Sequence, residues 1–329
     1  MILYHSTSKK AILLLIGEYA KLLLGDSMKR KLEGIFSLLL ATVIWGGAFV
    51  AQSAGMNLIG PMTFQAVRCA LAVFALILLT LLLEIRNWND IVHYVKKWSD
   101  PKLWITGLLC GLALFVATAL QQVALLYTDA GKAGFLTAMY IVIVPLLGYF
   151  LHKTPGINAI FGVGLAVVGM YLLCCAGVSQ INIGDVMLLG CAVAFAVQIT
   201  LVDKFAAQLD TLRLNCIQAL VVTVISSVFM LFESPRLDTI LDCWLPLSYA
   251  GVLSMGAGYS LQIFGQKRLE PTSASMIMSL ESVFAVVFGA IILREQMTDF
   301  ETWGCVLVFA AVILSQLPDN IGFIKKRSV

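Results

Sequence analysis

The chain has 329 residues, of which 60% are hydrophobic and only 12% are charged, and its mean hydropathy is +0.93. Soluble domains carry about 25% charged residues, so water is excluded as the main solvent, and the composition predicts an all-α integral membrane protein. The net charge of +3 comes from basic residues spread between apolar runs, which leaves no patch for nucleic acid.

Residues 1–32 are predicted to form a cytoplasmic N-terminal extension. The apolar patch at 11–16 is too short to cross a bilayer, and no cleavage site of a secretory signal follows it. Met28 and the three basic residues after it resemble a cytoplasmic amino terminus placed directly before a membrane span. Two alternatives stay open: translation that begins naturally at Met28, or residues 1–27 lying on the inner membrane surface.

Ten apolar windows follow, and each is close to the roughly 20 residues of a transmembrane helix. They lie at 34–53, 63–83, 104–126, 133–151, 157–177, 184–203, 214–232, 244–265, 273–293 and 302–318. Their connections are too short to hold a soluble domain. The sequence therefore predicts a single membrane unit that ends in a basic cytoplasmic tail at 319–329.

The positions of lysine and arginine predict the orientation of these spans. If the amino terminus is inside, the inner segments hold 18 of the 22 basic residues and the outer segments hold three. This distribution follows the positive-inside rule. We therefore expect a multi-pass protein of the inner (cytoplasmic) membrane, embedded in the lipid bilayer, with both termini in the cytoplasm.

The two halves of the chain resemble each other. A glutamine followed by a stretch of small and polar residues at 121–137 has a counterpart at 262–279, and residues 35–84 resemble 185–233 in length, hydropathy and terminal carboxylate. Self-similarity of this kind indicates a duplicated unit.

These counterparts predict two five-helix repeats, at 33–178 and 179–318. Because five is odd, the second repeat enters the membrane from the opposite side, so the repeats are inverted and related by a pseudo-two-fold axis in the membrane plane. Such a pair has two nearly equivalent packings, one open inward and one open outward, as alternating access requires. Duplication also produces channels, so a channel or facilitative pore for small solutes is the alternative.

Several motifs together resemble a known family. They are Trp45-Gly46 in the first span, the Gly-Phe-Leu-Thr stretch 134–137 leading to Pro145, residues 271–275, Ser279-Leu280-Glu281, and Leu293-Arg294-Glu295. The combination resembles the drug/metabolite transporter superfamily, in its ten-span form with two EamA domains, over roughly residues 33–318. The resemblance implies a permease for secondary transport of small polar metabolites or amino acids, often as efflux.

Glu281 is the acidic residue expected to matter most, because it lies about eight residues into the ninth span, roughly 12 Å deep. An ionised carboxylate at that depth costs about 2.5 to 3.5 kcal/mol. It either couples transport to protons, binds a substrate amine, or hydrogen-bonds a neighbouring helix. The family usually has proline after this glutamate, and Ser282 puts a proline-made break in doubt here, whereas Pro145 in the corresponding helix retains a possible kink.

Arg68 lies roughly 8 Å below the outer start of the second span. It is too far in depth from Glu281 for a direct ion pair, and Asp129 or another outer carboxylate is its expected partner. Arg68 either binds an anionic group of the substrate or is a structural arginine that snorkels to the membrane surface. Lys132, at the outer mouth of the fourth span, is expected to be a solvated end residue.

Further polar and aromatic residues are candidates for a cavity. Gln121 and Gln262 occupy matching places in the third and eighth spans, where they line a cavity or clamp helices together. Trp45, beside two glycines, gates the path, stacks on substrate, or packs in the core. The supporting candidates are Thr137, Tyr140, Ser279 and Tyr259, with Gln122 and Gln198.

Other activities find little support in the sequence. There is no G-x-x-x-x-G-K-[ST] loop for ATP and no H-E-x-x-H zinc motif, and the eight cysteines show no CxxC spacing. We therefore assign no catalytic residue, cofactor or metal ligand, and a membrane-embedded enzyme is the weaker alternative. Small residues at 162, 166 and 169 favour close helix packing and leave a homodimer open.

Overall fold

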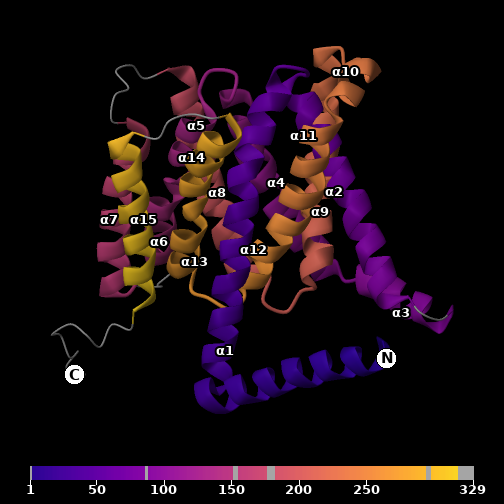
Figure 1. Ribbon diagram of the computed structural model, residues 1–329. Helices are drawn as coiled ribbons and strands as arrows, with labels where there is room; N and C mark the ends of the chain where they lie inside the picture. The colour runs from indigo at the N-terminus through magenta and orange to yellow at the C-terminus, as the bar shows by residue number, and fades with distance from the viewer. Residues whose placement is uncertain (1, 86–87, 151–154, 176–181, 294–297, 318–329) are drawn as a thin grey trace.

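The computed structural model is a bundle of α-helices, and its described part contains no β-strand (Figure 1). The structure describes residues 2–85, 88–150, 155–175, 182–293 and 298–317. The side chains of residues 2–25 lie outside that description, and so do the expectations for residues 1–27 and for the tail at 319–329.

Seven helices come from the first half of the chain. They are α1 (Ile2–Met56), α2 (Pro61–Glu84), α3 (Trp88–Trp98), α4 (Pro101–Ala124), α5 (Ala130–Ala138), α6 (Tyr140–Phe150) and α7 (Ile157–Cys175). Proline at the first helical position starts both α2 and α4, where its missing N–H would have had no partner in any case.

The second half follows the same plan with more interruptions. It contains α8 (Ile183–Phe205), α9 (Thr211–Met230), the 3-10 turn η1 (Leu231–Glu233), α10 (Leu237–Asp242), α11 (Trp244–Ser248), the π-helix η2 (Tyr249–Gly258), α12 (Tyr259–Gln266), α13 (Pro271–Met278), α14 (Leu280–Leu293) and α15 (Asp299–Gln316).

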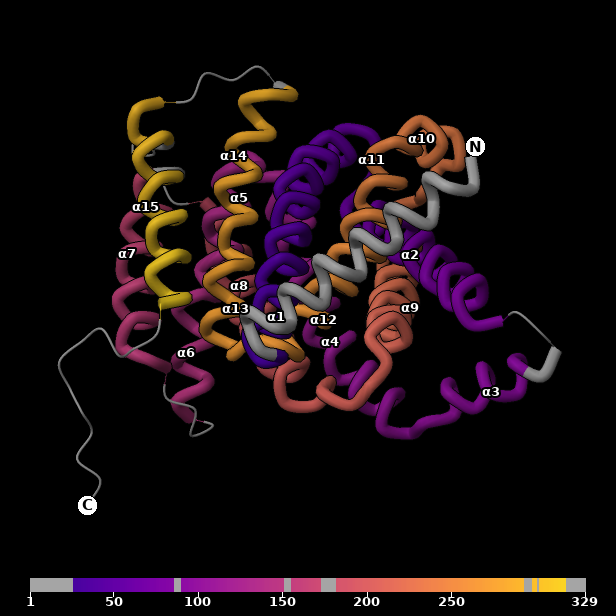
Figure 2. The backbone as a smooth tube through the Cα atoms, turned by 60° about the horizontal axis from the view of Figure 1, so that its bottom comes forward, coloured from indigo at the N-terminus to yellow at the C-terminus, as the bar shows by residue number. Residues whose placement is uncertain are grey.

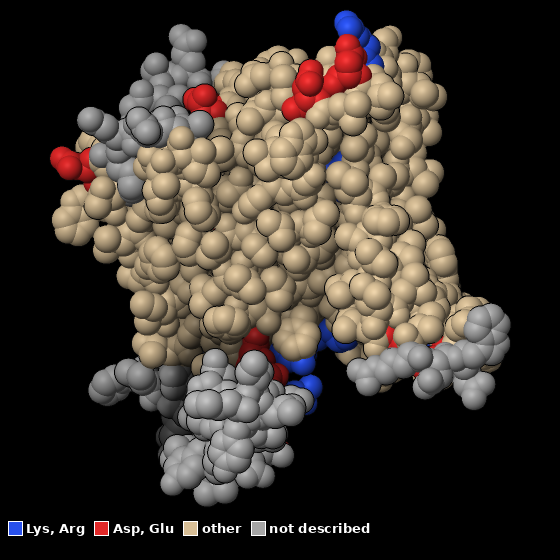
Figure 3. Space-filling model, turned by 45° about the vertical axis from the view of Figure 1, so that its right-hand side comes forward, with Lys and Arg blue, Asp and Glu red and all other residues tan. Residues whose placement is uncertain are grey.

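Seven segments of the described residues are long and apolar enough to cross a membrane. They are Asp26–Met56, Pro61–Glu84, Pro101–Ala124, Ala130–Phe150, Ile183–Phe205, Thr211–Glu233 and Pro271–Ile292, and shorter apolar helices cover Ile157–Leu172 and Thr302–Gln316. On the face shown in Figure 3, charged side chains gather at the two ends and leave an almost uncharged belt between them. The chain is therefore an all-helical membrane protein.

The helices form a centre with two flanks. α7 and α15, the last helices of the two halves, pack together at one edge, and α2 and α9 pack along each other towards the other (Figures 1 and 2). α1, α8 and the interrupted helices lie between these pairs.

The pair of α2 and α9 is tied together at both ends. Both oxygens of Glu84, at the end of α2, accept hydrogen bonds of 2.8 Å from Arg213 near the start of α9. The carboxylate of Glu233, just beyond α9, accepts hydrogen bonds from the backbone N–H groups of Met62 and Thr63 at the start of α2. A carboxylate at the C-terminal end of each helix therefore binds the first turn of the other helix.

The short helix α3 was not predicted, because residues 84–103 read only as a basic connection. Its last turn carries Lys96 and Lys97, and the rings of Tyr94 and Trp98 lie 5.0 and 5.3 Å from the Arg213 guanidinium. Arginine above an aromatic face is favourable. α3 therefore covers the end of the α2–α9 pair.

Gly46 lies where α1 packs closely against α14, and it gives a stability prediction. A Cβ at this position would overlap the Phe284 Cβ and the backbone at Ala285. We expect Gly46→Ala to lower the stability by about 1 to 3 kcal/mol, because the helices must separate. Thermal unfolding of the detergent-solubilised protein measures the loss. The matched control is Gly164→Ala, where no atom lies within 4 Å of the added Cβ; equal melting of the two variants would contradict the prediction.

Candidate functional site

Two membrane helices are interrupted at matching places in the halves. The first breaks at Met139 between α5 and α6, and the second at Ser279 between α13 and α14. Discontinuous helices near the midplane characteristically form the binding sites of transporters built from inverted repeats. The two breaks therefore mark the region of the candidate site.

The breaks have different chemical causes. Pro145 lies inside α6, where it cannot donate a backbone hydrogen bond, and the interruption lies on the N-terminal side of it. The second break needs no proline, contrary to the doubt raised by Ser282. Instead, the hydroxyls of Ser279 and Ser282 donate to the carbonyls of Met276 and Ser279 at 2.7 and 2.8 Å, and such bonds bend helices.

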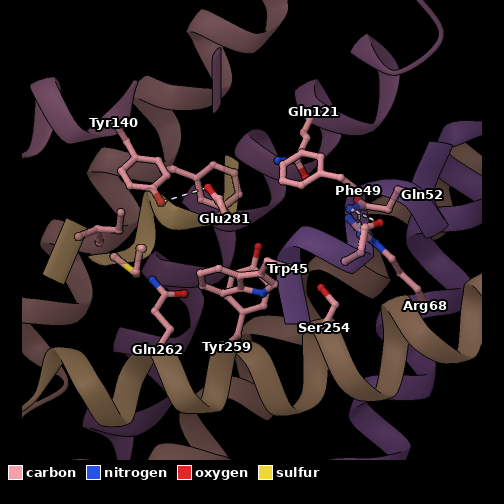
Figure 4. Close-up of a pocket in the computed structure, with 14 residues that line it drawn as sticks. Trp45, Phe49, Gln52, Arg68, Gln121, Tyr140, Ser254, Tyr259, Gln262 and Glu281 are labelled. Atoms are coloured by element: carbon pink, nitrogen blue, oxygen red, sulfur yellow. Dashed lines mark hydrogen bonds between the residues drawn. The ribbon is translucent and has the colours of Figure 1, made fainter. Parts of the chain in front are cut away.

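A pocket opens beside these breaks, with an empty volume of about 440 Å³ including its open side. Seven of the nine predicted site residues line it: Trp45, Arg68, Gln121, Tyr140, Tyr259, Gln262 and Glu281 (Figure 4). These residues come from both halves of the chain. The pocket therefore lies where the halves meet.

Glu281 meets Tyr140 in this pocket. The Tyr140 hydroxyl donates to a Glu281 carboxylate oxygen at 3.1 Å, and both side chains are buried. Among the described residues, no lysine or arginine lies within ion-pair distance of Glu281. Glu281 thus hydrogen-bonds a neighbouring helix, which is one of its expected roles, and it also faces the pocket.

Arg68 has different partners from those expected. Its guanidinium donates to the side-chain oxygens of Gln52 and Gln65, the latter at 3.1 Å. No described carboxylate lies within ion-pair distance, so the expectation that Asp129 pairs with Arg68 is wrong. The reason is local: Gln52 and Gln65 reach the guanidinium from α1 and from the preceding turn of α2.

Trp45 and Tyr259 form an aromatic wall of the pocket. Their ring centroids are 5.1 Å apart, and Trp45 is only 8% exposed. The glycine beside them, Gly258, lets α1 approach, since a Cβ there would touch the Trp45 indole nitrogen. Whether Trp45 gates or stacks on substrate stays a prediction.

The π-helix η2 helps position this wall. It brings Ser254 to the pocket and leads into Tyr259. The side-chain amide nitrogen of Asn215 lies 2.9 Å from the carbonyl oxygens of Met255 and Gly256. Because π-helical turns leave the regular hydrogen-bond pattern, an amide from α9 that binds these carbonyls stabilises the segment.

The predicted amides both line the pocket and join helices. Gln262 donates to Gln198 at 3.0 Å, and Gln198 donates to Gln218 at 3.0 Å, which links α12, α8 and α9. On the other side, Gln121 donates to the Thr137 hydroxyl at 3.2 Å. Thr137 therefore lies behind Gln121 and outside the pocket lining.

Two predicted residues lie outside the pocket lining. Thr137 is buried at 1% exposure behind Gln121, and Ser279 is fully buried at the helix break. Both side chains support residues around the pocket and do not line the pocket itself.

The sequence analysis missed several lining residues: Phe49, Gln52, Phe195, Ile199 and Ser254. Phe49 and Gln52 lie four and seven residues after Trp45, which places them on one helical face. Phe195 and Ile199 follow Trp45 and Phe49 by 150 positions. The helical period would have identified Phe49 and Gln52 from Trp45, and the internal repeat would have identified Phe195 and Ile199 from Trp45 and Phe49. Neither signal identifies Ser254.

Ion pairs between the halves flank the site, and one of them corrects an expectation. Lys132 is not a solvated end residue, because its ammonium lies 2.7 Å from the Asp185 carboxylate at the start of α8, and their side chains are only 15% and 7% exposed. Arg268 and Glu33 form a second pair at 3.4 Å, between the end of α12 and α1. The halves are thus joined by charge at both positions.

Comparisons with known proteins agree with this architecture. The model of the EamA-like transporter family matches residues 32–175 and 182–317. An uncharacterized transporter of Archaeoglobus fulgidus is 28% identical over 289 residues, covering 88% of this chain and 87% of that protein. The uncharacterized transporter YoaV of Bacillus subtilis is 23% identical over 297 residues, covering 88% and 97%.

One solved crystal structure has the same fold. It superposes with a TM-score of 0.72 over 86% of this chain and 96% of that one, at 15% sequence identity. The two family matches, which cover most of the chain, identify a multi-pass membrane transporter and not an enzyme. The chain belongs to the EamA-like transporter family.

Proposed function

We propose that this chain is a secondary transporter that exports small polar metabolites or amino acids across the cytoplasmic membrane by alternating access. In this proposal ten spans form two inverted repeats, residues 33–178 and 179–318, and both termini are cytoplasmic. The basic residues of the inner segments favour this orientation.

The contacts at the helix ends support the inversion. Met56, at the end of α1, accepts a contact from Gln122 at the end of α4, and Asn182, at the start of α8, donates to the Tyr127 carbonyl just beyond α4. α1 therefore ends at the side of the molecule where α8 begins. Since these are the first spans of the two repeats, they run in opposite directions, as inverted repeats require.

The observation that carries the proposal is the matched lining of the pocket. Gln121 and Gln262 are 141 positions apart, and so are Tyr140 and Glu281, which meet directly. When two repeats rock against each other, a site lined by equivalent positions of both repeats is still lined by the same residues. It is therefore suited to face either side of the membrane in turn.

Glu281 is the candidate for coupling. A buried carboxyl that faces a pocket and has a hydroxyl as its partner, with no described cation nearby, suits either a proton that travels with the cycle or an amine of the substrate. Protons are thus a proposed second partner besides the small-molecule substrate.

Counterflow in proteoliposomes tests the proposal. Metabolites are first screened by thermal stabilisation of the purified protein, since a ligand of the folded state raises the melting temperature. A stabilising compound is then loaded inside liposomes, and labelled compound is added outside. A carrier accelerates and saturates the exchange, whereas a channel shows no trans-stimulation, and that result would overturn the proposal.

A further inference from the structure

Arg68 is a buried cation without a described counter-charge, which sets it apart from the other buried arginine. Its side chain is 4% exposed, its two hydrogen-bond partners are neutral amides, the Phe64 ring lies 5.7 Å from the guanidinium carbon, and its Nε has no hydrogen-bond partner among the described residues. Arg213, fully buried, instead has the two oxygens of Glu84 at 2.8 Å and Asp210 at 3.5 Å. Within the part of the chain that the structure describes, carboxylates thus neutralise one buried guanidinium and not the other.

The guanidinium of Arg68 faces the pocket. Arg68 lines it together with Gln52, and Figure 4 shows the two at one end, Glu281 with Tyr140 towards the other, and Trp45 with Tyr259 between them. A cation in a membrane interior costs about 2.5 to 3.5 kcal/mol when it stands alone. The amide dipoles of Gln52 and Gln65 lower this cost but do not cancel the charge. An anion that enters the pocket neutralises the guanidinium, and the remaining cost is then recovered as binding free energy.

We infer that Arg68 binds the carboxylate of a small monoanionic organic substrate whose aromatic or apolar body lies against Trp45 and Tyr259. This inference rests on the proposed transport function and names the substrate class of the same pocket. The planar fork of arginine matches a carboxylate, and the aromatic wall offers flat apolar surface.

A phosphate monoester fits this pocket less well. It carries a charge of about −1.5 to −2 near neutral pH, whereas the pocket offers the single cation of Arg68 and also holds the acidic Glu281. A monocarboxylate balances Arg68 and leaves no surplus negative charge beside Glu281. The charge count therefore favours a carboxylate.

Melting temperatures with matched ligands test the inference. The probes are 3-phenylpropionate, 3-phenylpropionamide and 3-phenylpropylamine, and butyrate, butyramide and butylamine, each at millimolar concentration with the purified full chain. Within each set only the head group changes. We expect the carboxylates to stabilise the protein more than the amides and amines do.

Variants then locate the site. Arg68→Gln should weaken carboxylate binding about 10- to 100-fold, because a charge-assisted contact is lost. Arg68→Lys keeps the charge and should keep the preference for carboxylates with lower affinity, which also shows that the site is still folded. Arg236→Gln removes the same charge at an arginine whose side chain is 74% exposed and outside the pocket lining, so it is the matched control and should bind as the unmodified protein does.

The inference is wrong if amides or amines stabilise the protein as well as carboxylates, if no carboxylate stabilises it, or if Arg68→Gln binds them unchanged. These outcomes are separate from the failure of transport. If another solute shows counterflow and carboxylates do not bind selectively, the proposed carrier function holds and the anion site is wrong. If carboxylates bind but no counterflow occurs, the anion site holds and the carrier function is wrong.

Discussion

Glu84→Gln is expected to lower the free energy of unfolding by about 2 to 3 kcal/mol, because it leaves the buried Arg213 guanidinium without its bidentate partner. Removing one member of a fully buried pair costs about 3 to 5 kcal/mol. The loss is smaller here because the Glu84 side chain is 24% exposed and Asp210 remains at 3.5 Å. Thermal or denaturant unfolding in detergent measures the change.

A matched control exists at another junction of the two halves. Glu33→Gln removes the partner of Arg268, but these side chains are 42% and 21% exposed, so the loss should stay below about 1 kcal/mol. If both variants lose the same stability, the burial of Arg213 does not set the cost. If Glu84→Gln is neutral, the pairing does not hold α2 to α9.

Seven of the ten predicted spans match segments that are long and apolar enough to cross a membrane, and 157–177 and 302–318 match shorter apolar helices, because hydrophobic length is a local property. The predicted span 244–265 is divided among α11, η2 and α12. Every segment that is long and apolar enough to cross a membrane lies on a predicted span, since a bilayer crossing needs about 20 apolar residues wherever they occur. α3 was missed for the same reason. It is 11 residues long and amphipathic, so no window for a spanning helix detects it.

Contacts between distant residues could not be predicted in this way. Glu84 and Arg213 are 129 positions apart, and Lys132 and Asp185 are 53 positions apart. Neither separation leaves a periodic signal in the sequence. The partners of Arg68 were mistaken because a rule of charge pairing favours carboxylates, whereas two glutamines fill the space beside it.

The internal repeat was the most informative signal for the pocket. The offset of 141 positions identified Gln121 with Gln262, and the same offset joins Tyr140 to Glu281. Residues of the first helix of each half, such as Trp45 and Phe195, are separated by 150 positions instead. This second offset was not applied to predict individual pocket residues. It differs because the connections within the halves have unequal lengths.

Glu281→Gln is expected to abolish uphill transport driven by a pH gradient, because the amide still accepts a hydrogen bond from Tyr140 but cannot take up a proton. Counterflow, which needs no net proton movement, should persist. The measurement compares pH-driven accumulation with counterflow in the same proteoliposomes, using a compound that stabilises the purified protein. Accumulation should fall to the level of protein-free liposomes.

Two controls separate proton coupling from packing at this position. Tyr140→Phe removes the hydrogen bond and keeps the titrating carboxyl, so it should retain pH-driven accumulation. Glu281→Asp also keeps a carboxyl and should retain part of it. If Glu281→Gln accumulates substrate with unchanged pH dependence, Glu281 is a packing or amine-binding residue, and the driving force must act elsewhere. If Tyr140→Phe alone abolishes accumulation and counterflow together, the hydrogen bond between the halves is required for the cycle itself.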